Sequence, residues 1–240
     1  MANSWFEFKQ FRVEQAHCAM KVCTDACVLG AVADVAGARR LLDIGTGTGL
    51  LALMAAQRNP TAHIDAVELA PAAAAQAAAN FAASPWPHRL TLRPVSLQAF
   101  AQTRPLPYDG LLCNPPFFRQ SLPSPDAART TARHASDESL PFATIARFAT
   151  DFLTPTGQLT VLLPPPEMQE FVRVAVADGL YPTTQLTLHH RPGSRPLRHI
   201  TTFGRQPQPT QHHSLAIRAV DSEAYSSEFQ AILKDFYLHL

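Results

Sequence analysis

A glycine-rich turn between an expected strand and an expected helix is the feature of this sequence that most limits the possible folds. The segment LLDIGTGTGLLAL covers residues 41–53, and its glycines are Gly45, Gly47 and Gly49. Glycine lets a backbone bend tightly and approach a ligand, and the first turn of the following helix offers free N–H donors. The pattern therefore predicts a βα unit with a ligand at the carboxyl end of its strand.

Strand-like and helix-like segments alternate through the middle of the chain. Short apolar runs predict strands at 39–45, 63–69, 89–95, 108–114 and 157–164. Helical spacing or alanine-rich composition predicts helices at 50–59, 71–83, 138–153 and 167–179. Strands separated by crossover helices predict a parallel, doubly wound α/β sheet of the Rossmann-like type.

The pattern changes after Leu180, where two strand-like segments follow each other without a helix between them. These segments, 180–190 and 198–205, predict an antiparallel hairpin that completes a seven-stranded, mostly parallel sheet. Residues 212–220 predict an edge strand, and 226–240 a closing helix. We expect one domain over 1–240, with a lid-like extension at 1–38, a catalytic core at 39–206 and a C-terminal edge strand and helix at 207–240.

Composition limits the possible partners and locations of the protein. The net charge of +1 gives no global basic field, so any nucleic-acid surface must be a local patch. No apolar run approaches the roughly 20 residues of a membrane helix, and the start of the chain lacks a signal-peptide pattern, so we expect a cytoplasmic protein. The four cysteines lack paired CxxC spacing, and the ten histidines form no zinc motif, so we expect reduced thiols and no metal.

The spacing of the glycines indicates which cofactor the turn binds. A dinucleotide site requires G-x-G-x-x-G, whereas here the position that would need glycine is Leu50. Asp43 would repel a pyrophosphate but suits a cofactor that carries an ammonium group, and Glu68 can accept hydrogen bonds from two ribose hydroxyls. S-adenosylmethionine meets these requirements. The residues expected to bind it are Lys21, Thr24, Asp43, Gly45, Thr46, Gly47, Gly49, Glu68, Leu69, Ser96, Leu97 and Asn114.

An Asn-Pro-Pro-Phe segment, residues 114–117, follows the fourth expected strand of the core. Two acceptors, the Asn114 side-chain oxygen and the Pro115 carbonyl, can bind the two hydrogens of an exocyclic amine and favour a more tetrahedral nitrogen. Phe117 can stack on a planar base, a contact worth roughly 1–3 kcal/mol in other systems. A turn that merely ends a strand is the alternative. The catalytic residues expected here are Asn114, Pro115, Pro116 and Phe117.

These two motifs together resemble the N6-adenine and N5-glutamine class of amino-methyltransferases. The opening segment FKQFRVEQAHCAMKVCTDACVLGAV (8–32) and the Phe-Tyr-Leu at 236–238 are similar to those of the bacterial tRNA1(Val) adenine-N6 methyltransferase family. The resemblance implies a class I methyltransferase fold and methylation of adenosine 37 in a valine tRNA. That family commonly ends its acceptor motif with Tyr, where this chain has Phe117, so stacking is retained but any hydroxyl contact is lost.

Basic residues near the expected site suggest a rim that binds RNA phosphates. Lys9, Arg12, Lys21, Arg119, Arg129, Arg133, Arg191, Arg195 and Arg198 contribute to it, although each could be a solvated surface charge. The residues expected to contact substrate are Phe117, Phe118, Arg119, Arg133 and Arg195. Near Lys21 and Asp25, which could line the cofactor mouth, Thr24 could equally serve as a simple helix N-cap.

Two alternatives remain from the sequence. A protein glutamine amide is planar and fits the same pair of acceptors, which would make the chain an N5-glutamine methyltransferase. The chain could also be a non-catalytic RNA-binding protein on a methyltransferase fold, although Asp43, Glu68 and Asn114 are all present. We expect a monomer with tRNA as its partner and no membrane association.

Overall fold

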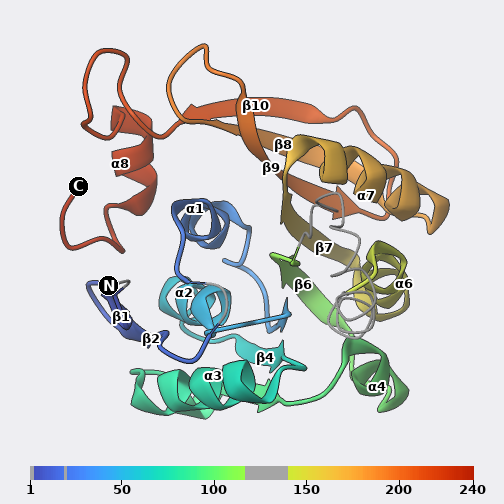
Figure 1. Cartoon of the computed structure of the whole chain (residues 1–240). Coiled ribbons are helices and arrows are strands. Elements are labelled where there is room, and N and C mark those ends of the chain that lie inside the picture. The colour runs from blue at the N-terminus through green and yellow to red at the C-terminus, as the bar shows by residue number, and fades with distance from the viewer. Residues whose placement is uncertain (1–2, 19–20, 117–139) are drawn as a thin grey trace, which may run out of the picture.

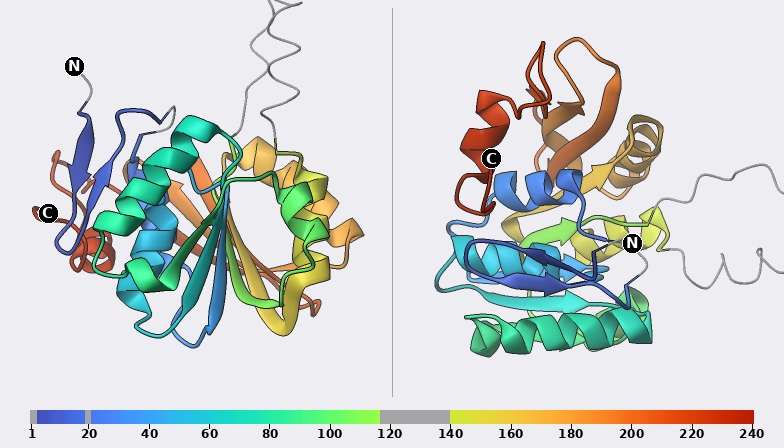
Figure 2. Two further views of the ribbon diagram at one scale, coloured as in Figure 1. Left: turned by 90° about the horizontal axis from the view of Figure 1, so that it is seen from below. Right: turned by 60° about the vertical axis from the view of Figure 1, so that its left-hand side comes forward.

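A computed structural model describes residues 3–18, 21–116 and 140–240 as a central sheet with helices on both faces (Figures 1 and 2). The main sheet is eight-stranded, and a separate two-stranded sheet lies near the N-terminus. The strands are β1 (Trp5–Glu7), β2 (Arg12–Glu14), β3 (Arg40–Ile44), β4 (His63–Val67), β5 (Leu90–Arg93), β6 (Tyr108–Cys113), β7 (Leu153–Leu163), β8 (Tyr181–His189), β9 (Pro196–Gly204) and β10 (Gln211–Ala216).

The order of the main sheet, β10-β8-β9-β7-β6-β3-β4-β5, confirms the doubly wound α/β prediction. Strands β3 to β7 run parallel, and the chain winds from β3 outward through β4 and β5 before it returns to β6 on the other side of β3. The point where the winding reverses lies between β3 and β6. Ligands of such sheets bind outside the carboxyl ends of the strands at this point.

The far end of the sheet is antiparallel, as expected from the loss of alternation after Leu180. Strand β9 pairs antiparallel with both β7 and β8, so it lies between them. Strand β10 then pairs parallel to β8 and forms the edge that residues 212–220 predict. With this edge strand the sheet has eight strands, one more than the expected seven.

The helices divide into two layers according to the face of the sheet that they cover. Helices α1, α2, α3 and α8 share one hydrophobic cluster with Leu41, Ile64 and Leu112, whereas α4, α6 and α7 share the other with Leu42, Ile44 and Leu111. The helices are α1 (Thr24–Val32), α2 (Leu50–Arg58), α3 (Pro71–Ala83), α4 (Leu97–Gln102), α6 (Phe142–Phe152), α7 (Pro165–Ala177) and α8 (Ser227–Leu233), with a 3-10 turn at Pro87–Arg89.

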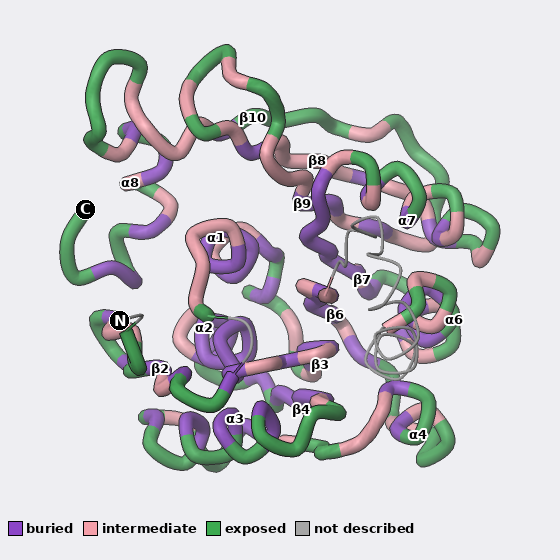
Figure 3. Tube along the Cα trace, in the orientation of Figure 1, coloured by how far each residue is buried: buried purple, intermediate pink, exposed green. Residues whose placement is uncertain are grey.

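Helix α2 is the most buried of these elements, and Figure 3 shows it almost entirely in the buried colour. Every residue from Leu50 to Ala56 is buried. A helix that is apolar on all sides must be covered on all sides, and here the sheet, α1 and neighbouring segments cover it. The glycine-rich turn is therefore anchored by a helix that has little freedom to move.

The N-terminal hairpin β1–β2 packs against the C-terminal segment rather than standing alone. Phe8 forms an isolated bridge with Tyr237, and the backbone N–H of Lys9 donates to the carbonyl of Phe236 over 2.8 Å. The ring of Phe6 lies 5.6 Å from that of Tyr237. Residues 1–38, the expected lid, thus contribute buried side chains from both the hairpin and α1 to the main core.

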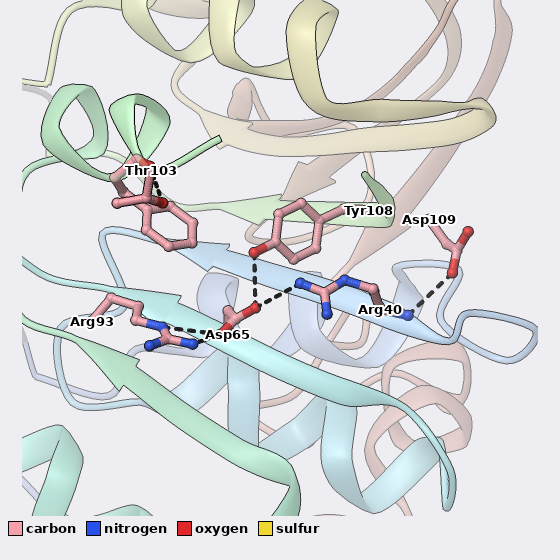
Figure 4. Close-up of polar contacts among 7 residues, drawn as sticks. Arg40, Asp65, Arg93, Thr103, Tyr108 and Asp109 are labelled. Atoms are coloured by element: carbon pink, nitrogen blue, oxygen red, sulfur yellow. Dashed lines mark hydrogen bonds and ion pairs between the residues drawn. The ribbon is translucent and has the colours of Figure 1, made fainter. Parts of the chain in front are cut away.

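A charged cluster around Asp65 lies within the α4 side of the sheet (Figure 4). The Asp65 carboxylate accepts a hydrogen bond of 2.8 Å from the Tyr108 hydroxyl and forms ion pairs with Arg40 and Arg93 at 3.2 and 3.3 Å. Burial and the neighbouring Asp65 charge raise the pKa of Tyr108, so its hydroxyl stays a donor. The cluster joins four strands, β3, β4, β5 and β6, through one carboxylate.

We expect the Asp65→Ala substitution to lower the free energy of unfolding by about 3 kcal/mol, because removal of one partner leaves two guanidinium groups and a buried hydroxyl without their acceptor. Urea unfolding followed by circular dichroism measures this loss. The matched control is Asp151→Ala, which breaks an exposed pair with Arg147 and should cost at most about 0.5 kcal/mol. Similar losses in the two variants would contradict the prediction.

Candidate active site

The glycine-rich turn has the backbone conformation that its sequence requires. Gly45, Gly47 and Gly49 have φ angles of 68°, 58° and 88°, a region that side-chain-bearing residues rarely adopt. A Cβ on Gly49 would lie 2.5 Å from the ring of Phe81, so this glycine also allows close packing against α3. A Cβ on Gly45 would meet no heavy atom within 4 Å, which leaves open space over the start of the turn.

The Asp43 side chain forms two hydrogen bonds that stabilise the glycine-rich turn and the start of α2. Its Oδ2 atom accepts hydrogen bonds from the Thr46 hydroxyl (2.6 Å) and the Ala52 N–H (3.1 Å), whereas its buried Oδ1 atom has no hydrogen-bond partner. Burial is the main reason that the pKa of Asp43 rises to about 7; the charge of Glu68 adds to it, and the two hydrogen bonds oppose it. A cationic group near this carboxylate would stabilise its charged form.

Glu68 lies one residue beyond β4 and reaches across to the same turn. Its two carboxylate oxygens accept hydrogen bonds of 2.8 Å from the N–H groups of Gly47 and Ala70. Each oxygen keeps a lone pair for a further donor, which suits a pair of hydroxyls. The next side chain, Leu69, is 54% exposed, so its apolar surface is available to a ligand.

Ser96 and Leu97 begin α4 at the carboxyl edge. The Ser96 hydroxyl is the N-cap of this helix and accepts a hydrogen bond of 3.1 Å from the Ala99 N–H. Leu97 is buried in the core with Phe100. The local contacts of both side chains are therefore those of a helix start, and their expected contact with the cofactor stays a prediction.

Asn114 follows β6 directly beside the glycine turn. Cys113 pairs with Ile44 in the parallel register, so the next residues along the two strands, Asn114 and Gly45, begin at the same level of the sheet. Neighbouring strands lie about 4.8 Å apart. Asn114 is half-buried and Pro115 is buried. The remaining residues expected to contact the acceptor, Phe117, Phe118, Arg119 and Arg133, lie outside the described residues.

The chain is similar to known proteins over nearly all of its length. The model of the methyltransferase small domain matches residues 17–164. Two relatives are each 42% identical to this chain over 235 residues. Both are named tRNA1(Val) (adenine(37)-N6)-methyltransferase, and they come from Yersinia pseudotuberculosis serotype O:3 and Yersinia pestis strain Pestoides F. These matches cover 98% of this chain and 92% and 94% of the relatives. The chain belongs to the tRNA1(Val) (adenine(37)-N6)-methyltransferase family. The resemblance expected from its two motifs and its opening segment is confirmed.

Solved structures support the methyltransferase fold of this family member. A predicted O-methyltransferase from Agrobacterium tumefaciens superimposes with a TM-score of 0.62 at 21% identity, covering 88% of this chain and 96% of that one. A ribosomal protein L11 methylase from Lactobacillus delbrueckii gives a TM-score of 0.58 at 14% identity, covering 81% and 84%. At these identities the likeness concerns the fold alone.

The N-terminal segment expected to resemble the family includes β2 and α1. Helix α1 begins at Thr24 with Cys23 as its N-cap, so the alternative of Thr24 as the N-cap was wrong by one residue. Lys21 is exposed and donates from Nζ to the carbonyl of Gln15 over 2.9 Å. Asp25 forms an ion pair of 2.9 Å with Arg198, which ties α1 to β9.

Most of the basic side chains expected to form a rim for RNA make contacts within the chain. Arg191 pairs with Glu223 and donates to the carbonyl of Ala219, while Arg198 pairs with Asp25. Arg12 pairs with Glu7, and Lys9 donates to a backbone carbonyl. Arg195 is exposed in the connection between β8 and β9. Of Arg191, Arg195 and Arg198, only Arg195 is in the exposed class, and its expected contact with RNA stays a prediction.

One residue beside the methyltransferase turn was missed by sequence reasoning. Asn80 of α3 is 2% exposed, and its amide bonds both to Thr48 in the glycine turn and to Glu14 in β2. Asn80 is one of two polar residues, with Gln76, in the alanine-rich stretch 71–83, and this is the sequence signal that could have drawn attention to it.

Three further properties of the described residues concern cysteine pairing, metal binding and membrane spans. Cys18, Cys23, Cys27 and Cys113 do not form disulfide bonds. Within the described residues, no three His, Cys, Asp or Glu side chains come together in a way that could hold a metal ion. None of the helices in those ranges combines the length and apolar character that crossing a membrane requires.

Proposed function

We propose that this protein transfers a methyl group from S-adenosylmethionine to the exocyclic N6 amine of adenosine 37 in a valine tRNA. The observation that most strongly supports this function is the register of β3 with β6, because it puts Asn114 and Pro115 next to the glycine-rich turn. A pair of carbonyl acceptors beside a cofactor turn suits methylation of an amine. The names of the full-length relatives point to the same substrate.

The residues around the turn fit the chemistry of S-adenosylmethionine, which supplies an activated methyl group when bound. The unpartnered and buried Oδ1 atom of Asp43 supplies negative charge for a cofactor with cationic groups. Glu68 retains acceptor capacity for two ribose hydroxyls, and Leu69 offers exposed apolar surface for the adenine. The open space at Gly45 accommodates a ligand that lies against the backbone.

Asn114 and Pro115 act on the nitrogen that receives the methyl group. The lone pair of an exocyclic amine is delocalised into the ring, which makes the nitrogen a poor nucleophile. We assign the Asn114 Oδ1 atom and the Pro115 carbonyl as acceptors for its two hydrogens, so that the lone pair points toward the methyl group. Correct placement supplies much of the rate, and the amine proton becomes acidic after transfer, so the site needs no strong general base.

Stacking is assigned to Phe117, which follows the two prolines. An aromatic face can hold the extruded adenine against the crevice and contribute roughly 1–3 kcal/mol of binding. Arg195 is the exposed cation that we assign to phosphate contact. A tRNA substrate would agree with the expected cytoplasmic location.

Methylation of defined RNA tests this function. Purified protein and labelled S-adenosylmethionine should modify an unmodified valine tRNA transcript, and replacement of its adenosine 37 by guanosine should abolish the incorporation. Nuclease digestion and mass spectrometry of the nucleosides would locate N6-methyladenosine at that position. Label found in protein instead of RNA would favour a glutamine amide as the acceptor. An absence of S-adenosylmethionine binding by calorimetry would favour a non-catalytic RNA-binding protein.

A further inference from the structure

The side-chain amide of Asn80 is a junction between three segments that are distant in sequence. Its Nδ2 atom donates to the carbonyl of Thr48 over 2.8 Å and to the carbonyl of Glu14 over 2.9 Å. Its Oδ1 atom accepts from the N–H of Glu14 over 3.0 Å. Both amide hydrogens are therefore used, within a side chain that is almost completely buried.

The bond to Thr48 fixes the last peptide of the glycine-rich turn. Rotation of the Thr48–Gly49 peptide would move the carbonyl that Asn80 holds, and it would also break the hydrogen bond of 2.9 Å from Gly49 N–H to the carbonyl of Thr46. Gly49 is the N-cap of α2 and has a positive φ. A turn with three glycines has many accessible backbone conformations, and hydrogen bonds from neighbouring segments, such as that from Asn80, favour one of them.

The bonds to Glu14 connect this restraint to the N-terminal segment. Glu14 is the last residue of β2, and the following residue, Gln15, accepts a hydrogen bond of 2.7 Å from the N–H of Val22 just before α1. Strand β2 is thus linked to the glycine-rich turn through one amide of α3.

We propose that Asn80 is a positioning residue that sets the shape of the glycine-rich turn and thereby the affinity for S-adenosylmethionine, without touching the cofactor. This inference rests on the proposed function only in that it takes S-adenosylmethionine as the cofactor. It distinguishes Asn80 from an ordinary core amide, whose loss would lower stability but leave the cofactor affinity of the folded protein unchanged.

The test compares Asn80→Ala with Gln76→Ala, which removes another buried amide one turn earlier on α3. Both full-length variants are assayed at a temperature where circular dichroism shows them folded. For Asn80→Ala we expect the KM and the calorimetric Kd for S-adenosylmethionine to rise roughly tenfold. The kcat at saturating cofactor should stay within about twofold and the KM for tRNA should not change, because the acceptor residues are untouched.

Asn80→Ser provides a second variant in case the alanine variant does not fold. Its shorter hydroxyl cannot span Thr48 and Glu14, and it can satisfy itself on the preceding turn of α3. The same rise in the Kd is expected. An unchanged Kd in a folded Asn80 variant, or an equal rise in Gln76→Ala, would overturn the inference. Wild-type protein that binds S-adenosylmethionine but does not methylate tRNA would refute the proposed function alone, while the Kd comparison would still decide the role of Asn80.

Discussion

Asn114→Ala is expected to lower the rate of methyl transfer at least about a hundredfold while S-adenosylmethionine still binds. The substitution removes one of the two acceptors that orient the exocyclic amine, and loss of one such preorganised partner typically costs two to three orders of magnitude in other enzymes. Asn114 follows β6 and does not contribute to the turn between β3 and α2. Single-turnover transfer to valine tRNA at saturating protein measures the chemical step directly.

Calorimetric titration with S-adenosylmethionine is the control for this variant. Its Kd should stay within about threefold of the wild-type value, a difference well under 1 kcal/mol. A variant that retains wild-type transfer would refute the role of Asn114 as an acceptor. A variant that loses transfer and cofactor binding together would assign Asn114 to the cofactor site instead.

Asp43→Asn is expected to weaken S-adenosylmethionine binding by about 2 kcal/mol, or roughly thirtyfold, without loss of stability at pH 8. The asparagine can keep an oxygen toward Thr46 and Ala52, so the turn retains its hydrogen bonds. What it removes is the negative charge, which we assign to the recognition of a cationic cofactor. Calorimetry for binding and thermal unfolding for stability measure the two effects separately.

The pH dependence of wild-type stability follows from the same carboxyl group. Burial raises its folded-state pKa to about 7 from an ordinary value of 3.8, so the folded state holds a proton that the unfolded chain has already lost. Unfolding free energy should therefore fall as the pH rises from about 4 to about 7, by an amount on the order of 3 kcal/mol. Asp43→Asn should abolish this contribution. Cofactor affinity of the wild type should rise over pH 5–7, and an affinity that is independent of pH would contradict the role of the charge.

The sequence could predict those parts of the site in which local chemistry dictates both residue type and conformation. Three glycines at fixed spacing admit a left-handed turn that other residues resist, and two prolines must end a strand. Apolar runs bounded by such signals locate β3, β4 and β6 to within one or two residues of their observed ends. Because carboxyl ends of parallel strands meet at one edge, the sequence alone groups Asp43, Glu68 and Asn114.

Other features depend on pairings across the fold and leave little trace in the sequence. The Asp65 cluster draws its members from four strands, and nothing local to Tyr108 or Arg93 indicates their shared carboxylate. The alanine-rich sequence around Asn80 predicts a helix but does not indicate that its side chain contacts β2 and the glycine-rich turn. Short helix α4 was not expected at all, because its six residues are too few for a clear hydrophobic period.

The position of β9 between β7 and β8 has a consequence for how the sheet is assembled. Within the main sheet, β8 is connected to β7 solely through β9, and β10 is connected solely through β8. Loss of the β7–β9 ladder would disconnect these three strands from the rest of the sheet and leave along β7 an unpaired edge that other molecules could join.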